Sequence, residues 1–171
     1  FGDAAVAAVV TRAEPHEPSA ICHARFQTYH SGADLTAVLG GGTRHHPNDP
    51  ATTPEMNLFH MDGPGVFKKA ARIVGPFLDT FLHEAGWTRE AIDYVVPHQA
   101  SRHGIELLTA RLGFRSEQVF SNLPLRGNCI AASIPLGLAE AVATGQVQRG
   151  HRLLLMGTGA GLTIGAMTLV F

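Results

Sequence analysis

The most regular feature of the chain is an amphipathic run over residues 66–82. Apolar side chains recur there at steps of three and four residues, which is the spacing of one face of a helix. They are Val66, Phe67, Ala70, Ile73, Val74, Phe77, Leu78, Phe81 and Leu82. Gly86 follows in the position of a helix C-cap. A helix with so wide an apolar face has to cover another layer, so the rest of the chain must supply that layer.

Short aliphatic runs before and after this helix indicate a sheet. Strands are predicted over residues 1–12, 20–29, 92–96, 118–123, 152–157 and 163–171, and further helices over 101–112 and 130–144. Residues 31–61, rich in Gly, Pro, His and Asn, are predicted to form a long loop. This order predicts an α/β fold whose mixed sheet is mostly parallel, covered on both faces, with an antiparallel edge or tail.

Composition narrows the class of protein. The 171 residues are 45% hydrophobic and 16% charged, which suits one globular domain. A net charge of −1 leaves no basic surface for nucleic acid, and no apolar run approaches the roughly 20 residues of a membrane-spanning helix. The opening at Phe1 lacks an initiator methionine, so we expect a longer parent chain. Cys22 and Cys129 form neither a disulfide framework nor a metal spacing, which favours a reducing cytoplasm.

Two polar residues follow neighbouring predicted strands. The strand at 92–96 ends in Pro97 and His98, and Asn128 follows Gly127 at the turn before the helix at 130–144. Alone, each has an ordinary interpretation: a loop histidine with a backbone partner, and an asparagine that suits a turn or a cap. Together, at successive strand-to-helix turns, they predict a site, because α/β folds build their sites there.

Other motifs carry weaker signals. Gly157 to Gly161 lacks the third glycine of a dinucleotide-binding loop and precedes a strand, so it better suits a turn whose amides face an oxyanion. The ten histidines are scattered, and the adjacent His45 and His46 have no ligands at metal spacing, so no metal is expected. Cys129 could be a nucleophile with His98 as its base. A small, buried residue at a helix start is the preferred interpretation of that cysteine.

Two segments together resemble a known family. Residues 96–100 read V-P-H-Q-A, and residues 127–136 read G-N-C-I-A-A-S-I-P-L. They resemble the carboxyl-terminal half of β-ketoacyl-acyl carrier protein synthase III, a member of the thiolase-like condensing superfamily. The resemblance extends to residues 1–3, to 61–68 and to the glycine turn at 159–165.

The resemblance implies a fold of five layers, α-β-α-β-α. Residues 1–12 would be the last strand of the amino-terminal half, and residues 13–171 the carboxyl-terminal half. It also implies a triad of cysteine, histidine and asparagine, in which His98 and Asn128 take the second and third places. The cysteine would lie upstream of Phe1, and Cys129 stands where the family often has threonine. The backbone amide of Ala160 would bind the oxyanion formed at the acyl-cysteine.

The same resemblance implies an activity. An acyl group, taken from acyl-CoA onto the cysteine, would condense with malonyl-ACP or malonyl-CoA by decarboxylative Claisen chemistry, with no permanently bound cofactor or metal. From the resemblance we also expect acyl carrier protein as a partner, a homodimer, a cytoplasmic location, and a role in fatty acid or polyketide biosynthesis. One departure is Thr158, where phenylalanine is common. It leaves open an acyltransferase, a condensation without decarboxylation, or a non-catalytic partner subunit.

Overall fold

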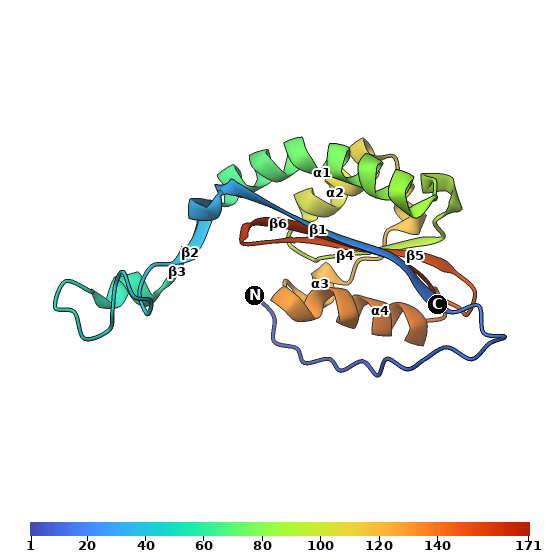
Figure 1. The fold of residues 1–171 in the computed structure, drawn as a ribbon, viewed down its shortest axis with the longest axis horizontal. Helices are drawn as coiled ribbons and strands as arrows, with labels where there is room; N and C mark the ends of the chain where they lie inside the picture. Colours follow the sequence, from blue (N-terminus) through green and yellow to red (C-terminus); the bar gives the residue numbers. More distant parts are fainter.

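A computed structural model describes residues 1–171, apart from the side chain of residue 108. Its main feature is a four-stranded sheet between two helical layers (Figure 1). The strand order is β1 (Ala20–Gly32), β6 (Gly161–Val170), β5 (Arg152–Gly159) and β4 (Tyr94–Pro97). Only β4 and β5 pair in parallel, while β5–β6 and β6–β1 are antiparallel. The protein is therefore α/β with a mixed sheet, as predicted.

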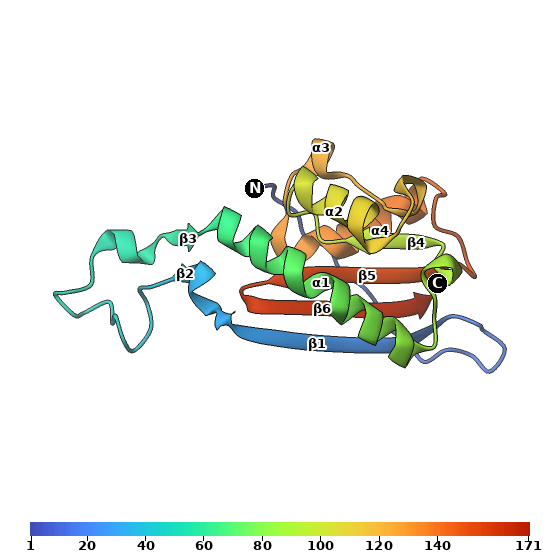
Figure 2. The same cartoon turned by 90° about the horizontal axis from the view of Figure 1, so that it is seen from above.

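Helix α1 (Gly63–Ala85) is the predicted amphipathic helix. Asp62 caps it by accepting a hydrogen bond from the Gly65 N–H at 3.0 Å, and Gly86 ends it in the left-handed conformation, at φ 67°. The helix lies across one face of the sheet (Figure 2), with its apolar side chains against the strands. The resulting core combines Val74, Phe77, Leu78, Phe81 and Leu82 with Leu154, Met156, Ile164 and Ala166 of β5 and β6.

The remaining elements complete the two helical layers. The helices are α2 (Arg102–Leu112), α3 (Leu123–Arg126) and α4 (Ser133–Ala143). Helix α2 lies where a helix was predicted; Ser101 caps it by accepting a hydrogen bond from the Gly104 N–H, and Gly113 ends it in the left-handed conformation. Helix α4 covers the face of the sheet opposite α1 and α2 (Figure 1). A second core forms there from Val96, Phe120, Ala141, Val147 and Leu153.

Short 3₁₀ helices and a small hairpin connect these elements. The 3₁₀ helices are η1 (Ala33–Leu35), η2 (Pro54–Asn57), η3 (Arg89–Ala91), η4 (Ser116–Gln118) and η5 (Ile130–Ala132). Strands β2 (Thr36–Val38) and β3 (Phe59–Met61) pair within the predicted long loop, which projects away from the sheet (Figure 1). None of the helices in the described structure is both long and apolar enough to span a membrane.

Three strand predictions need correction. The sheet is mixed but not mostly parallel, because β5 and β6 form a hairpin and β1 joins the free edge of β6. The segment 118–123 contributes one parallel bridge, Val119 to Val95, in place of a strand.

Residues 1–12 form no strand in the described structure, and Val9 and Val10 are 91% and 79% exposed. A strand that is apolar on both faces needs a packed layer on each side, and the described chain provides no such layer for residues 1–12. Its place in an amino-terminal half stays a prediction.

Candidate active site

The site is built where β4 and β5 end. Because these strands are parallel, their carboxyl ends meet at one edge of the sheet, with Pro97 level with Met156. The His98 N–H donates to the Met156 carbonyl at 2.8 Å, which continues the ladder by one residue. A Cβ added to Gly157 would lie 2.8 Å from the His98 Cβ and 3.2 Å from Ile134 Cδ1. The glycine therefore leaves room for the imidazole between β5 and α4.

Asn128 sits in a turn with unusual backbone geometry. Gly127 has φ 69°, and Ile130 has φ 52°, a left-handed value that β-branched residues rarely adopt. The turn directs the Ile130 N–H to Asn128 Oδ1, at 2.8 Å. This hydrogen bond fixes the side-chain oxygen of Asn128 and leaves its NH₂ group free to donate to a ligand. Strain of this kind concentrates at functional sites.

The backbone of Ile130, in the Asn128 turn, lies near the His98 imidazole. Partial burial of the imidazole lowers the pKa of His98 below its ordinary value of 6.5, and the nearby Ile130 backbone acts in the opposite direction. Among the described residues, no charged side chain contributes to this shift. The lowered pKa favours a neutral imidazole near pH 7, which carries one N–H donor.

The third predicted group, Ala160, lies at the turn between β5 and β6 and is exposed. It is three residues beyond Gly157, so it shares the edge of the sheet that carries His98. Thr158, half-buried near the end of β5, directly follows Gly157 and is two residues before Ala160. The structure thus places all three groups at one edge of the sheet, with Ile130, whose N–H is bonded to Asn128 Oδ1, near the His98 ring. Their catalytic roles stay predictions.

The amino-terminal residues lie against the Asn128 turn, a contact that the sequence interpretation missed. The Gly2 N–H donates to the Asn128 carbonyl at 2.8 Å. A Cβ on Gly2 would lie 2.0 Å from the Arg126 carbonyl oxygen, so only glycine fits this approach. Cys129 is buried beside it, with its Sγ 3.4 Å from the Arg126 carbonyl oxygen. This packing suits the preferred interpretation of Cys129 as a buried helix-start residue.

A polar network holds the segment that leads to Asn128. Asn122 donates through Nδ2 to Glu140 on α4 at 2.7 Å, and Arg126 donates through Nε to the same carboxylate at 2.6 Å. The Asn122 hydrogen bond lowers the pKa of Glu140, burial opposes it, and Arg126 adds to the lowering. Helix α3 is thereby fixed to α4, which begins beyond the Asn128 turn.

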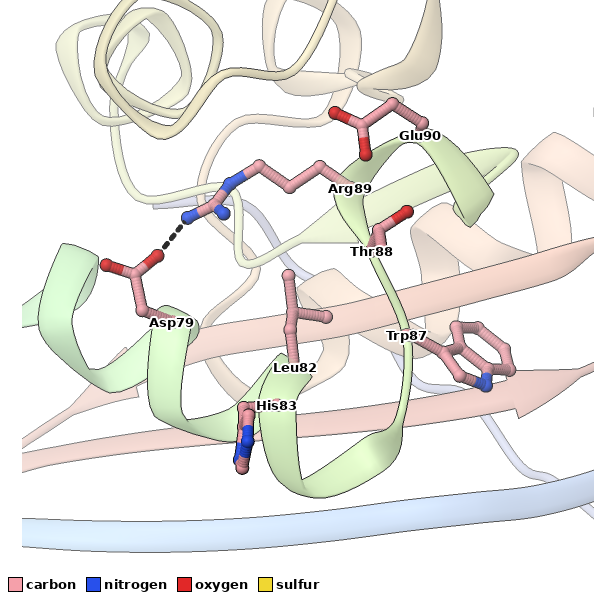
Figure 3. A pocket seen from close by; sticks show the side chains of 7 residues that line it. All are labelled: Asp79, Leu82, His83, Trp87, Thr88, Arg89 and Glu90. Carbon is pink, nitrogen blue, oxygen red and sulfur yellow. Dashed lines mark hydrogen bonds and ion pairs between the residues drawn. The ribbon is translucent and has the colours of Figure 1, made fainter.

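A separate cavity of about 320 Å³ lies at the carboxyl end of α1 (Figure 3). Two of its charged groups bind each other: Arg89 pairs with Asp79, and Arg89 also donates to the Leu112 carbonyl at 2.6 Å. These contacts tie α1 to the end of α2, and the cavity does not include His98 or Asn128. Within the described residues, no group of three His, Cys, Asp or Glu side chains could hold a metal ion.

Comparison with known sequences identifies the family. The family model of the 3-oxoacyl-[acyl-carrier-protein (ACP)] synthase III C terminal matches residues 82–171, just over half of the chain. The chain belongs to this family. The synthase III match includes both His98 and Asn128, and it confirms the resemblance stated from the sequence.

Synthase III relatives match over part of their own length. Beta-ketoacyl-[acyl-carrier-protein] synthase III of Neisseria gonorrhoeae (strain NCCP11945) is 45% identical over 111 residues, covering 65% of this chain and 35% of that protein. Its counterpart in Nitratidesulfovibrio vulgaris (strain DP4) is 39% identical over 172 residues, covering 100% and 52%. The chain therefore spans about a third to a half of the length of these curated relatives.

Solved synthase III structures share the fold. The enzyme of Aquifex aeolicus VF5 aligns with a TM-score of 0.76 at 32% identity, covering 92% of this chain and 46% of that one. The Thermus thermophilus structure aligns at 0.79 with 33% identity, covering 95% and 49%. These alignments confirm the thiolase-like fold class.

Proposed function

We propose that this chain acts as the carboxyl-terminal half of a β-ketoacyl-acyl carrier protein synthase III, which condenses an acyl-cysteine with a malonyl thioester. The observation that carries the proposal is the pair of donors at one sheet edge, the His98 imidazole at the end of β4 and the Asn128 carboxamide, whose Oδ1 is held by the Ile130 N–H. Family membership supports it, since the beta-ketoacyl-[acyl-carrier-protein] synthase III relatives of Neisseria gonorrhoeae and Nitratidesulfovibrio vulgaris match 65% and 100% of the chain.

The first chemical step of the proposal is decarboxylation. As the malonyl C–C bond breaks, its electron pair moves onto the thioester carbonyl and forms an enolate, and carbon dioxide leaves. The N–H of neutral His98 and the NH₂ of Asn128 both donate to the enolate oxygen. Each well-placed donor of this kind contributes roughly 2.7–4 kcal/mol to the transition state. A carboxamide does not titrate near pH 7, so only His98 can also move a proton.

The second step forms the new C–C bond. The enolate carbon attacks the carbonyl carbon of the acyl-cysteine, and its carbonyl oxygen becomes an oxyanion. The backbone amide of Ala160 donates to that oxyanion. When the tetrahedral intermediate collapses, the C–S bond breaks and the cysteine leaves as a thiolate, ready for the next acyl group.

The proposal requires groups from outside this chain. An amino-terminal half supplies the cysteine, residues 1–12 complete that half as its last strand, and residues 13–171 form the carboxyl-terminal half. Acyl-CoA and malonyl-ACP or malonyl-CoA are the substrates, with no bound cofactor or metal. We further propose that acyl carrier protein is a partner, and that the enzyme is a cytoplasmic homodimer. We call the assembly of this chain with its cysteine-bearing half the two-half enzyme.

Thr158 favours a second candidate function. A hydroxyl in place of an apolar ring near the malonyl carboxylate stabilises the ionised carboxylate. This stabilisation disfavours the loss of carbon dioxide. An enzyme that condenses two acyl thioesters without decarboxylation, or that transfers the acyl group to an oxygen or nitrogen nucleophile, would tolerate this change.

The deciding experiment follows acylation and carbon dioxide release separately. The two-half enzyme is incubated with an acyl-CoA and its intact mass is recorded; malonyl-CoA or malonyl-ACP is then added. An acyl adduct that discharges with carbon dioxide release supports the decarboxylating condensation. An adduct that persists until another acyl thioester or nucleophile is added supports the second candidate. No adduct at all would identify a non-catalytic partner subunit.

A further inference from the structure

We infer that Gln99 is a positioning residue, whose buried carboxamide holds the strand end that carries His98 in register with the segment that leads to Asn128. Gln99 follows His98 directly, yet its side chain points into the protein and has 0% exposure. The catalytic consequence of this inference depends on the proposed function, whereas the structural coupling does not.

The contacts of Gln99 join two separate segments. Its Nε2 donates to the Pro97 carbonyl at 3.0 Å and to the Phe120 carbonyl at 3.2 Å. Its Oε1 accepts a hydrogen bond from Ser121 Oγ at 3.2 Å. Both N–H groups and the acceptor are therefore engaged, as a fully buried carboxamide requires. The side chain acts as a clamp between the end of β4 and residues 120–121.

The clamped segment leads to Asn128 through a hydrogen-bonded path. Asn122 follows Ser121 directly and is bonded to Glu140 on α4, which also binds Arg126. The Gly127 N–H in turn donates to the Leu123 carbonyl at 2.9 Å. A shift of residues 120–121 relative to β4 therefore changes the position of the Asn128 turn relative to His98. Displacements of about 1 Å between catalytic groups cost on the order of 10²-fold in rate.

A second buried glutamine provides a matched control. Gln118 is 3% exposed, its Nε2 donates to the Ile92 carbonyl at 2.6 Å, and its Oε1 accepts from the Arg115 N–H at 3.1 Å. It joins the same two parts of the chain, but before β4 begins instead of at the carboxyl end. Loss of its hydrogen bonds costs stability without disturbing the edge that carries His98.

The test compares Gln99→Met with Gln118→Met, which remove the carboxamide and keep a side chain of similar length. The His98 imidazole is titrated by NMR in this chain, with its signal assigned through a His98→Gln variant. We expect Gln99→Met to raise the His98 pKa toward 6.5, because a loosened strand end admits water to the ring. We expect Gln118→Met to titrate like the unsubstituted chain.

The same variants are then measured in the two-half enzyme with malonyl-CoA. Gln99→Met should slow carbon dioxide release by about 10²-fold while cysteine acylation continues, and Gln118→Met should slow neither. Ser121→Ala, at an exposed position, should also raise the His98 pKa and slow carbon dioxide release, but by less than Gln99→Met. If Gln99→Met does not fold, this variant tests the inference in its place.

Equal effects of the two glutamine substitutions, or an unchanged His98 titration in both Gln99→Met and Ser121→Ala, would overturn the inference. If the unsubstituted two-half enzyme releases no carbon dioxide, the proposed function fails, and the NMR titration alone still decides the role of Gln99.

Discussion

At the scale of single residues, the proposed function assigns His98 and Asn128 to the condensation step and not to acylation of the cysteine. His98→Ala or Asn128→Ala in the two-half enzyme removes one donor to the enolate oxygen. We expect each to lower the condensation rate by about 10²–10³-fold while acylation of the cysteine continues. Condensation is measured as product formed from acyl-CoA and malonyl-CoA, and acylation by intact mass. His30→Ala and Asn48→Ala, both at exposed positions, are the matched controls. Loss of acylation in both site variants would contradict the assigned roles.

The lowered pKa of His98 also predicts how stability depends on pH. Burial lowers this pKa in the folded state, so the unfolded chain binds the proton more readily. The free energy of unfolding should therefore fall as the pH drops below about 6.5, and level off once the pH passes the folded pKa of His98. Urea unfolding at a series of pH values measures this change. In His98→Gln the corresponding part of the pH dependence should vanish. If that variant keeps the full slope, other groups are responsible.

Site residues with a distinctive functional group can be recognised in the sequence. Residues that act through a partner far away in the chain cannot. His98 and Asn128 stand out because an imidazole and a carboxamide follow predicted strand ends. Gln99 and Gly2 do not, since nothing local indicates that Gln99 meets Phe120 or that Gly2 approaches Arg126. Such contacts arise only when segments far apart in the chain pack together.

At the scale of elements, capping gives a prediction for α1. Asp62→Ala removes the acceptor for the Gly65 N–H and leaves that donor without its partner. We expect the free energy of unfolding to fall by about 1 kcal/mol, measured by urea denaturation. Asp3→Ala, in the extended amino-terminal segment, is the control and should change it little. An equal effect of both substitutions would mean that general charge, and not the cap, accounts for the loss.

Helices are predicted better than strands here, for a physical reason. The bonds of α1 and α2 are local, so their periodicity and their end residues Gly86, Ser101 and Gly113 mark them in the sequence. The pairing of a strand is not local. The run at 118–123 has strand composition but makes one bridge, and β1 pairs with β6 from the other end of the chain. Neither partner is visible from composition.

At the scale of the whole molecule, the two faces of the sheet are covered unequally. Helix α4 packs on β4 and β5, and on its side the β1 residues Cys22, Ala24, Phe26 and Thr28 remain exposed. Phe26 is 76% exposed, and its ring lies over Gly165 of β6. An apolar sheet face open to water is typical of a surface that another layer covers. The proposed function supplies that layer, since the amino-terminal half would pack on this side.

This arrangement predicts a substitution that separates folding from assembly. Phe26→Thr removes an aromatic side chain that is already mostly in water, so the free energy of unfolding of this chain should change by no more than about 0.5 kcal/mol. If the amino-terminal half covers β1, the same change should weaken its binding by about tenfold or more, measured by calorimetric titration of the two halves. Phe67→Ala, on α1 at the opposite face, is the control and should leave the affinity unchanged. Equal affinities for the Phe26 variant and the unsubstituted chain would show that this face of the sheet is not where the halves meet.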